Sequence, residues 1–199
     1  RYHVLLIFDE VITGFRLARG GAQERFGVKA DITTLGKIAG GGLPVGVYGA
    51  SHEIMSKVAP DGPVYQAGTL SGNPIAIAAG IATLQKLVPS AYQKLEQLGQ
   101  YFEDAMQPVV KRFGGRFLFV RFASIFALYF TDDDNITSVD MVKECNMQQF
   151  AQFHREMLER GIYLSPSGYE VGFLSIAHTK EDIDTTVIAI DESLAVVLG

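Results

Sequence analysis

The chain has 199 residues, of which 48% are apolar, and its 17 Lys and Arg against 22 Asp and Glu give a formal net charge of −5. This composition is typical of a globular protein with a sizeable core, built as one large domain or two small ones. A mildly acidic chain without basic runs argues against a nucleic-acid partner, because phosphate binding needs concentrated Lys and Arg. No stretch approaches the ~20 uninterrupted apolar residues of a membrane span, so no membrane partner is expected.

The start of the chain is a continuous apolar run over residues 4–8. The run lacks alternation, as in a parallel strand that is covered on both faces. Such a strand needs neighbours on either side, and little sequence precedes it to supply them. We therefore expect the chain to be the C-terminal part of a longer protein. Cys145 is the only cysteine and cannot form an internal disulfide, which favours a reducing compartment.

The region up to about residue 87 is predicted to be α/β. Residues 32–36 and 45–48 are predicted to form two further strands, separated by glycine-rich sequence. Asn73 and Pro74 predict the start of a helix, because Asn is a favoured N-cap and Pro fits the first helical position. The small residues that follow predict close packing. The buried side of this helix is expected to carry Ile75, Ala79 and Leu87.

The second region begins on a long helix, which Ser90 is predicted to cap. The predicted elements after it are strands over 117–121 and 125–130, a helix over about 138–160, and short strands over 162–164 and 174–177. Thr179 and Asp182 predict a capping box for the last helix, whose apolar stripe is expected to comprise Ile183, Val187, Ile190 and Leu194. We expect part of a large domain over 1–88, a connecting helix over 89–113 and a small α+β domain over 114–199.

Asp9 is the first candidate site residue. A carboxylate at the carboxyl end of a buried strand lies where open α/β sheets bind ligands, and its burial is costly unless a cation or strong donor faces it. A helix cap or a structural ion pair explains Asp9 at least as well. The adjacent Glu10 is more typical of a supporting or surface group.

Lys37 is the second candidate, between an apolar strand and a glycine cluster. A partly desolvated lysine can attack a carbonyl carbon to form an imine, and glycines allow a bulky ligand to approach the backbone closely. An ordinary surface lysine is the more common explanation. A P-loop is excluded, because Asp31 stands where its first glycine is required and Ile38 follows the lysine.

Two further segments carry weaker signals. Residues 65–74 place small and hydroxylated residues ahead of a helix, which indicates either an anion site or a simple capping loop. Glu170 stands among aromatic residues and glycine, where it is suited to pairing with an amine, although a turn glutamate that points to solvent explains it more simply.

Taken together, these segments resemble the class III aminotransferases, which are pyridoxal 5'-phosphate (PLP) enzymes of fold type I. The resemblance runs from the first residue to the last and looks closest to the aminomutase branch of that family. The segments that carry it are residues 6–11, 13–16, 20–23, 26–28, 34–38, 40–46 and 62–74.

The resemblance implies an α/β fold, with part of a PLP fold type I large domain (mainly parallel sheet with helices) followed by a smaller α+β C-terminal domain. It implies that Lys37 bonds covalently to PLP and later shuttles protons. Asp9 would pair with the protonated pyridine nitrogen, which keeps the ring an electron sink. Val11 would pack against the ring face.

The resemblance also implies a homodimer. Thr69, with the backbone of Gly68, would bind the phosphate of the cofactor in the neighbouring subunit, and Tyr65 would lie near cofactor and substrate. The remaining cofactor and substrate contacts are expected on sequence outside this chain. No metal is expected in the site.

Glu170 favours a mutase over an ordinary transaminase, which usually carries an arginine here. A carboxylate would repel a substrate carboxylate and attract an amine, which suits an intermediate that bears two amines. The implied reaction starts from pyridoxamine 5'-phosphate and converts glutamate-1-semialdehyde into 5-aminolevulinate, the tetrapyrrole precursor. Glutamyl-tRNA reductase is a candidate partner for substrate transfer, and the cytoplasm (the plastid in a plant or alga) is the expected location. The alternatives are a class III omega-aminotransferase and a catalytically silent chain of the same fold.

Overall fold

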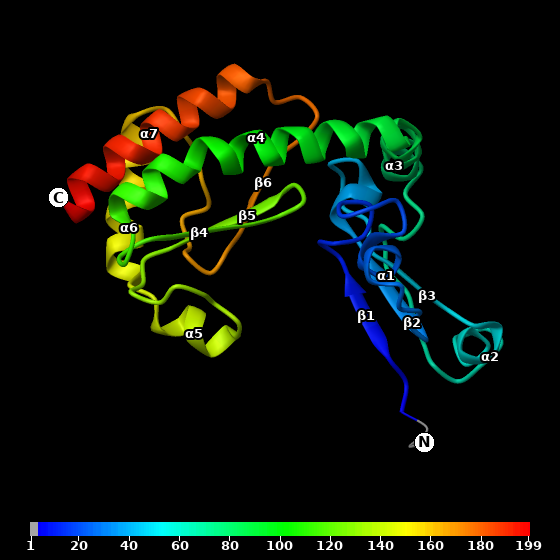
Figure 1. Ribbon diagram of the computed structural model, residues 1–199. Coiled ribbons are helices and arrows are strands. Elements are labelled where there is room, and N and C mark those ends of the chain that lie inside the picture. Colours follow the sequence, from blue (N-terminus) through cyan, green and yellow to red (C-terminus); the bar gives the residue numbers. More distant parts are fainter. Residues whose placement is uncertain (1–3) are drawn as a thin grey trace. The chain divides into compact units, whose positions relative to one another are not determined.

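The computed structural model describes residues 4–199, which divide into two compact units that meet between Tyr92 and Gln93. The elements that begin before this point are β1 (Ile7–Glu10), α1 (Gly21–Phe26), β2 (Ile32–Leu35), the 3-10 helix η1 (Lys37–Gly40), β3 (Val47–Ala50), α2 (His52–Met55), α3 (Pro74–Lys86) and α4 (Pro89–Phe113). Those that follow are β4 (Leu118–Phe122), β5 (Ile125–Tyr129), α5 (Val139–Glu144), α6 (Met147–Glu159), β6 (Gly172–Phe173) and α7 (Lys180–Leu198) (Figure 1).

The sheet of unit 1 has the order β1-β2-β3. The parallel direction of β1 is confirmed by its pairing with β2, whereas β2 and β3 are antiparallel. The described sheet is therefore mixed, not mainly parallel, because only a short connection without an α-helix joins β2 to β3.

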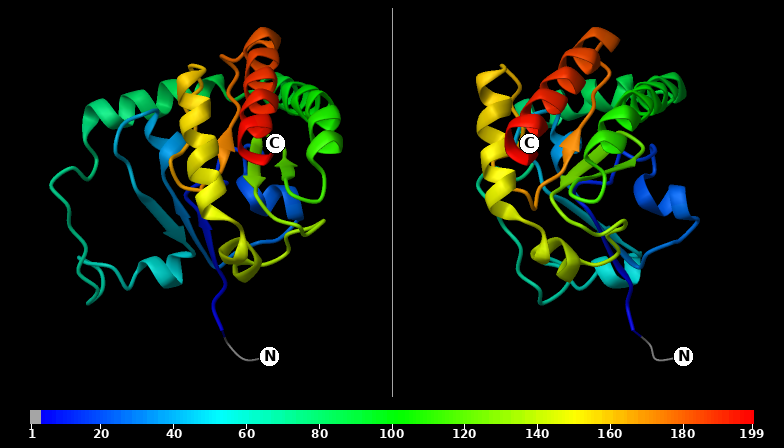
Figure 2. Two further views of the ribbon diagram at one scale, coloured as in Figure 1. Left: turned by 90° about the vertical axis from the view of Figure 1, so that its left-hand side faces the viewer. Right: turned by 60° about the vertical axis from the view of Figure 1, so that its left-hand side comes forward.

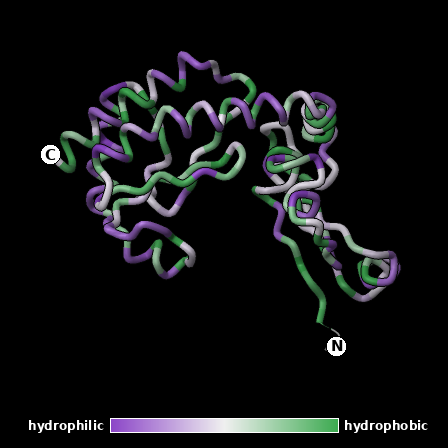
Figure 3. The backbone as a smooth tube through the Cα atoms, viewed as in Figure 1, coloured by the Kyte–Doolittle hydropathy of each residue, from purple (hydrophilic) through white to green (hydrophobic). Residues whose placement is uncertain are grey.

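The first strand is shorter and less covered than predicted. It begins at Ile7, and the apolar residues from Val4 to Ile7 are exposed because β1 is an edge strand with β2 as its one partner in the described chain. Figure 3 shows this apolar segment leading into β1. Before the strand, the N–H of Leu6 donates to Asp31 Oδ2 at 2.8 Å, which fixes the register of the parallel pair.

Helix α3 begins where Asn73 and Pro74 predict it, with Asn73 Oδ1 accepting from the N–H groups of Ile75 and Ala76. The prediction of its buried face is wrong, because Ile75 is 71% exposed whereas Ala76 and Gly80 are buried. A Cβ atom on Gly80 would lie 2.2 Å from the carbonyl oxygen of Ala39, so only glycine fits at this position against η1. The predicted close packing is thus confirmed, on a different face.

Unit 2 packs α4, α6 and α7 against the antiparallel sheet β4-β5-β6. Figures 1 and 2 show α6 and α7 side by side. The core centres on Phe102, Met106, Phe153 and Met157, with Ile190 and Leu194 from the predicted stripe of α7. The capping box of Thr179 and Asp182 is confirmed.

Three predicted elements of unit 2 are wrong. The helix expected over 138–160 is split at Cys145, because Asn146 caps α6 and donates its N–H to the carbonyl of Phe130 at 2.8 Å. No strand forms over 162–164, and β6 precedes the predicted 174–177. Gly172 of β6 stands opposite Phe126 of β5. A Cβ atom at position 172 would lie 2.1 Å from the Phe126 ring, so the residue opposite this ring has to be glycine.

Candidate functional site

Asp9 lies near the carboxyl end of β1, directly opposite Thr34 of β2. Its Oδ1 accepts hydrogen bonds from the N–H of Val11 at 3.0 Å and from the hydroxyl of Thr34 at 3.1 Å. Within residues 4–199, Oδ2 has no hydrogen-bond partner, and the residue is exposed. One oxygen is therefore fixed while the other remains able to accept a hydrogen bond.

Lys37 follows β2 after Gly36 and opens η1. Its φ of +46° lies in the left-handed region, which costs an ordinary residue roughly 1–2 kcal/mol and often marks functional positions. The residue is exposed, and its amine has no hydrogen bond or ion pair within the described chain. The turn thus leaves an unpaired primary amine at the carboxyl end of β2.

Val11 joins these two residues. A Cβ atom on Gly36 would lie 3.3 Å from Cγ1 of Val11, so the valine side chain packs directly on the backbone that precedes Lys37. The structure therefore brings Asp9, Val11 and Lys37 to one end of the parallel β1–β2 pair. Thr34 belongs to the same group and was missed by the sequence analysis, although its place opposite Asp9 follows from the pairing of the two strands.

Of the two expectations for Glu10, a supporting group or a surface group, the structure excludes the surface group, because Glu10 is only 1% exposed. Its Oε2 accepts from the Thr13 hydroxyl at 2.6 Å and the Ala22 N–H at 2.8 Å, and its Oε1 accepts from the Gln23 N–H at 2.9 Å. Burial raises the pKa of the Glu10 carboxyl, but these hydrogen bonds outweigh burial and lower the pKa below its ordinary value. The sequence alone could not choose between the two expectations, because Ala22 and Gln23 lie 12 and 13 residues further along the chain.

The loop before α3 carries Tyr65, Gly68 and Thr69, all exposed, with Tyr65 at 83%. No hydrogen bond joins them to Asp9 or Lys37 in the part of the chain that the structure describes. The same loop walls an open hollow of about 510 Å³ opposite the glycine-rich residues after η1. Its lining comprises Pro44, Val45, Gly46, Val47, Gly68, Leu70, Ser71, Gly72, Asn73 and Ile77.

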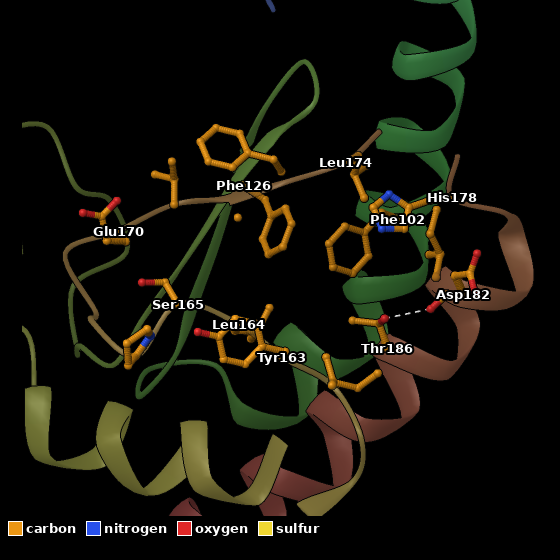
Figure 4. A pocket seen from close by; sticks show the side chains of 16 residues that line it. Phe102, Phe126, Tyr163, Leu164, Ser165, Glu170, Leu174, His178, Asp182 and Thr186 are labelled. Atoms are coloured by element: carbon orange, nitrogen blue, oxygen red, sulfur yellow. Dashed lines mark hydrogen bonds between the residues drawn. The ribbon is translucent and has the colours of Figure 1, made fainter. Parts of the chain in front are cut away.

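Glu170 lies in unit 2, where its N–H donates to the carbonyl of Ser167 at 3.1 Å in a tight turn. The residue is exposed and stands at one end of a hollow of about 500 Å³, with Phe126 in its wall and His178 and Asp182 at the far end (Figure 4). This arrangement fits both a turn glutamate that points to solvent and a carboxylate that borders an apolar cavity.

In residues 4–199, no single helix is both long and apolar enough to cross a membrane, and α3 and α4 meet that test only as a broken pair.

The family model described as aminotransferase class-III matches residues 1–194, and the chain therefore belongs to the class III aminotransferases. Two curated relatives are named glutamate-1-semialdehyde 2,1-aminomutase. The protein from Akkermansia muciniphila is 49% identical over 196 residues, which are 98% of this chain and 46% of the relative. The protein from Pelotomaculum thermopropionicum is 53% identical over 192 residues, which are 95% of this chain and 44% of the relative. The chain thus spans about half the length of the curated relatives it matches.

Solved structures share the fold. An omega-transaminase from Sphaerobacter thermophilus superimposes on 100% of this chain and 45% of its own, with a TM-score of 0.85 and 30% identity. A glutamate-1-semialdehyde aminomutase from Pseudomonas aeruginosa, in complex with PMP, superimposes on 96% of this chain and 44% of its own, with a TM-score of 0.82 and 25% identity. The α/β fold is therefore that of aminotransferase structures over slightly less than half of their chains.

Proposed function

We propose that this chain carries the lysine-bearing part of a PLP-dependent aminomutase that converts glutamate-1-semialdehyde into 5-aminolevulinate. One observation carries the proposal. A carboxylate oxygen of Asp9 and the amine of Lys37, both without a hydrogen-bond partner in the described chain, lie at the same end of two parallel strands. Identity of about half to relatives named for this reaction supports it.

The residues present fit the cofactor. A protonated ring nitrogen needs a carboxylate acceptor, and Oδ2 of Asp9 is available because Oδ1 is occupied by Val11 and Thr34. An aldehyde needs a primary amine, and that of Lys37 has no other partner in the described chain. Gly36 carries no side chain of its own, so Val11 packs directly on the backbone that precedes Lys37.

When bound, PLP supplies an electron sink for the negative charge that develops at the substrate carbon beside the amine. Asp9 would hold the ring nitrogen in its protonated form. Lys37 Nζ would anchor the cofactor and move the proton at that substrate carbon. Val11 would pack against one ring face.

The exposed loop before α3 would serve a second subunit. Gly68 and Thr69 would bind the cofactor phosphate of the neighbouring protomer, and Tyr65 would lie near that site. The exposure of all three residues supports this proposal. With such a contact between protomers, the active protein would be a homodimer with two shared sites. Residues 1–88 would then belong to the cofactor domain and 114–199 to the small domain, joined by 89–113, in a cytoplasmic protein.

Glu170 would select the mutase reaction, because its carboxylate attracts an amine and repels a substrate carboxylate. A second candidate, an omega-aminotransferase, is favoured by the structural likeness to the enzyme of Sphaerobacter thermophilus.

The test uses the full-length protein with PLP and its Lys37→Ala variant. The proposal predicts an absorbance band of protein-bound PLP that requires Lys37. It also predicts that the protein loaded with pyridoxamine 5'-phosphate converts the semialdehyde with no amino donor added. Turnover only in the presence of an added amino acid would favour the aminotransferase. No band in either protein would favour a silent chain.

A further inference from the structure

Glu10 is a buried group that the proposed chemistry does not use. It is the only buried charged residue in the range 4–199. A buried carboxylate is costly unless hydrogen bonds satisfy it, and here donors from three residues converge on both of its oxygens. Gly21 is part of the same enclosure, since a Cβ atom on it would lie 2.2 Å from Glu10 Oε2.

The contacts of Glu10 lead by two routes to the two groups that hold Asp9. The first route is the turn after β1, where the Thr13 hydroxyl binds the Glu10 carboxylate and the Gly14 N–H binds the Glu10 carbonyl at 2.9 Å. This turn contains Val11, whose N–H donates to Asp9.

The second route runs through Gln23. Its backbone N–H binds Glu10, and its side-chain amide donates to the Thr33 hydroxyl at 3.0 Å. Thr33 directly precedes Thr34, the other donor to Asp9. Glu10 thus binds the turn after β1 and the start of α1 directly, and it is linked to β2 through Gln23.

We propose that Glu10 is a positioning residue for Asp9. By fixing the segments that carry Val11 and Thr34, its carboxylate keeps Oδ1 of Asp9 occupied and leaves Oδ2 for the ring nitrogen of PLP. The inference rests on the proposed role of Asp9 toward that cofactor.

The experiment compares Glu10→Gln with Glu24→Gln in the full-length protein. Glutamine at position 10 keeps the shape but turns one acceptor oxygen into a donor that faces other donors. Glu24 is a matched control, because it lies in the same segment, is exposed, and accepts a single backbone N–H, that of Gly20 at 2.6 Å.

Two quantities are measured: hydrogen exchange of the Val11 amide without cofactor, and PLP affinity from the absorbance band. For Glu10→Gln we expect exchange at Val11 to accelerate and PLP affinity to fall, each by about tenfold, with a changed band position. For Glu24→Gln both should stay within about twofold of wild type. Thr13→Val removes one donor to Glu10, so it should accelerate exchange at Val11 and lower PLP affinity, each several-fold. This variant replaces Glu10→Gln in the test if Glu10→Gln does not fold.

Unchanged exchange at Val11, or wild-type PLP affinity in a folded Glu10→Gln protein, would overturn the inference. A merely structural role would lower the thermal stability of the variant and leave the affinity and the band of the folded fraction unchanged. If wild type itself binds no PLP, the proposed function fails, and exchange at Val11 still decides whether Glu10 positions Asp9.

Discussion

The two units of this chain are stabilised in different ways. Unit 2 buries large apolar side chains such as Phe102, Phe153 and Leu194 between helices and sheet. In the described part of unit 1, the buried positions are mostly glycines and the carboxylate of Glu10, with Leu17 the only large apolar residue among them. Substitutions should therefore separate a unit that depends on apolar burial from one that depends on hydrogen bonds and close backbone contacts.

The largest effect is expected in unit 1 from Lys37→Ala. Loss of the amine that holds the cofactor and moves the proton should lower turnover of the full-length enzyme by at least about a thousandfold. The matched control is Lys29→Ala, another exposed lysine of the same unit. Comparable losses from both substitutions, measured as kcat, would remove Lys37 from the proposed site.

The largest stability effect is expected in unit 2 from Phe153→Ala. Phe153 is fully buried among aromatic neighbours, so its truncation should lower the free energy of unfolding by about 3–5 kcal/mol. Leu158→Ala on the same helix, at an exposed position, should cost less than about 1 kcal/mol. Chemical denaturation measures both, and similar losses would contradict the assigned core.

Gly21→Ala tests the close contacts of unit 1. Gly21 and Gly27 both have left-handed φ values, +68° and +64°, but only at Gly21 would a new Cβ atom meet the Glu10 carboxylate. Gly27→Ala should cost about 1 kcal/mol from backbone strain alone, and Gly21→Ala about 1–3 kcal/mol more. Equal thermal shifts in the two variants would show that the enclosure of Glu10 is not tight.

The pH dependence of stability tests the same carboxylate. Because the pKa of Glu10 is lower in the folded chain than in the unfolded one, its contribution is present above the ordinary glutamate pKa of about 4.3 and is lost as pH falls through the folded value. The stability difference between wild type and Glu10→Gln should therefore shrink below about pH 4. A difference that stays constant from pH 7 to pH 3 would argue against this ionised, hydrogen-bonded state.

The smallest effect is expected in unit 2 from Ser124→Ala. The Ser124 hydroxyl is buried without a hydrogen-bond partner in the described chain, so its removal should leave stability unchanged or raise it by up to about 1 kcal/mol. A clear loss of thermal stability would reveal a contact of this hydroxyl that the structure does not contain.

The sequence predicted correctly those features, such as helix caps, that depend on residues close together in the chain. The Asn73 cap and the capping box of Thr179 and Asp182 depend on residues two or three apart, and both formed as expected. The buried face of α3 depends instead on the distant backbone of Ala39, so the choice of Ile75 as a buried residue failed. The same reason explains β6, whose position is set by the ring of Phe126 against Gly172.

The candidate site shows the same division. Asp9 and Lys37 could be selected because a carboxylate and an amine at strand ends have recognisable chemistry. For Glu10 the sequence left a supporting and a surface group open, because its burial depends on Ala22 and Gln23, which only the folded loop brings to it. Glu170 lies in the other unit, and its proposed role stays a prediction.

The most direct test of the account follows the nitrogen of the product. The full-length enzyme would receive ¹⁵N-labelled glutamate-1-semialdehyde in the presence of excess unlabelled amino acids, and the 5-aminolevulinate formed over many turnovers would be analysed by mass spectrometry. An aminomutase predicts product that retains the ¹⁵N label almost completely. Unlabelled product would contradict the account and identify an aminotransferase.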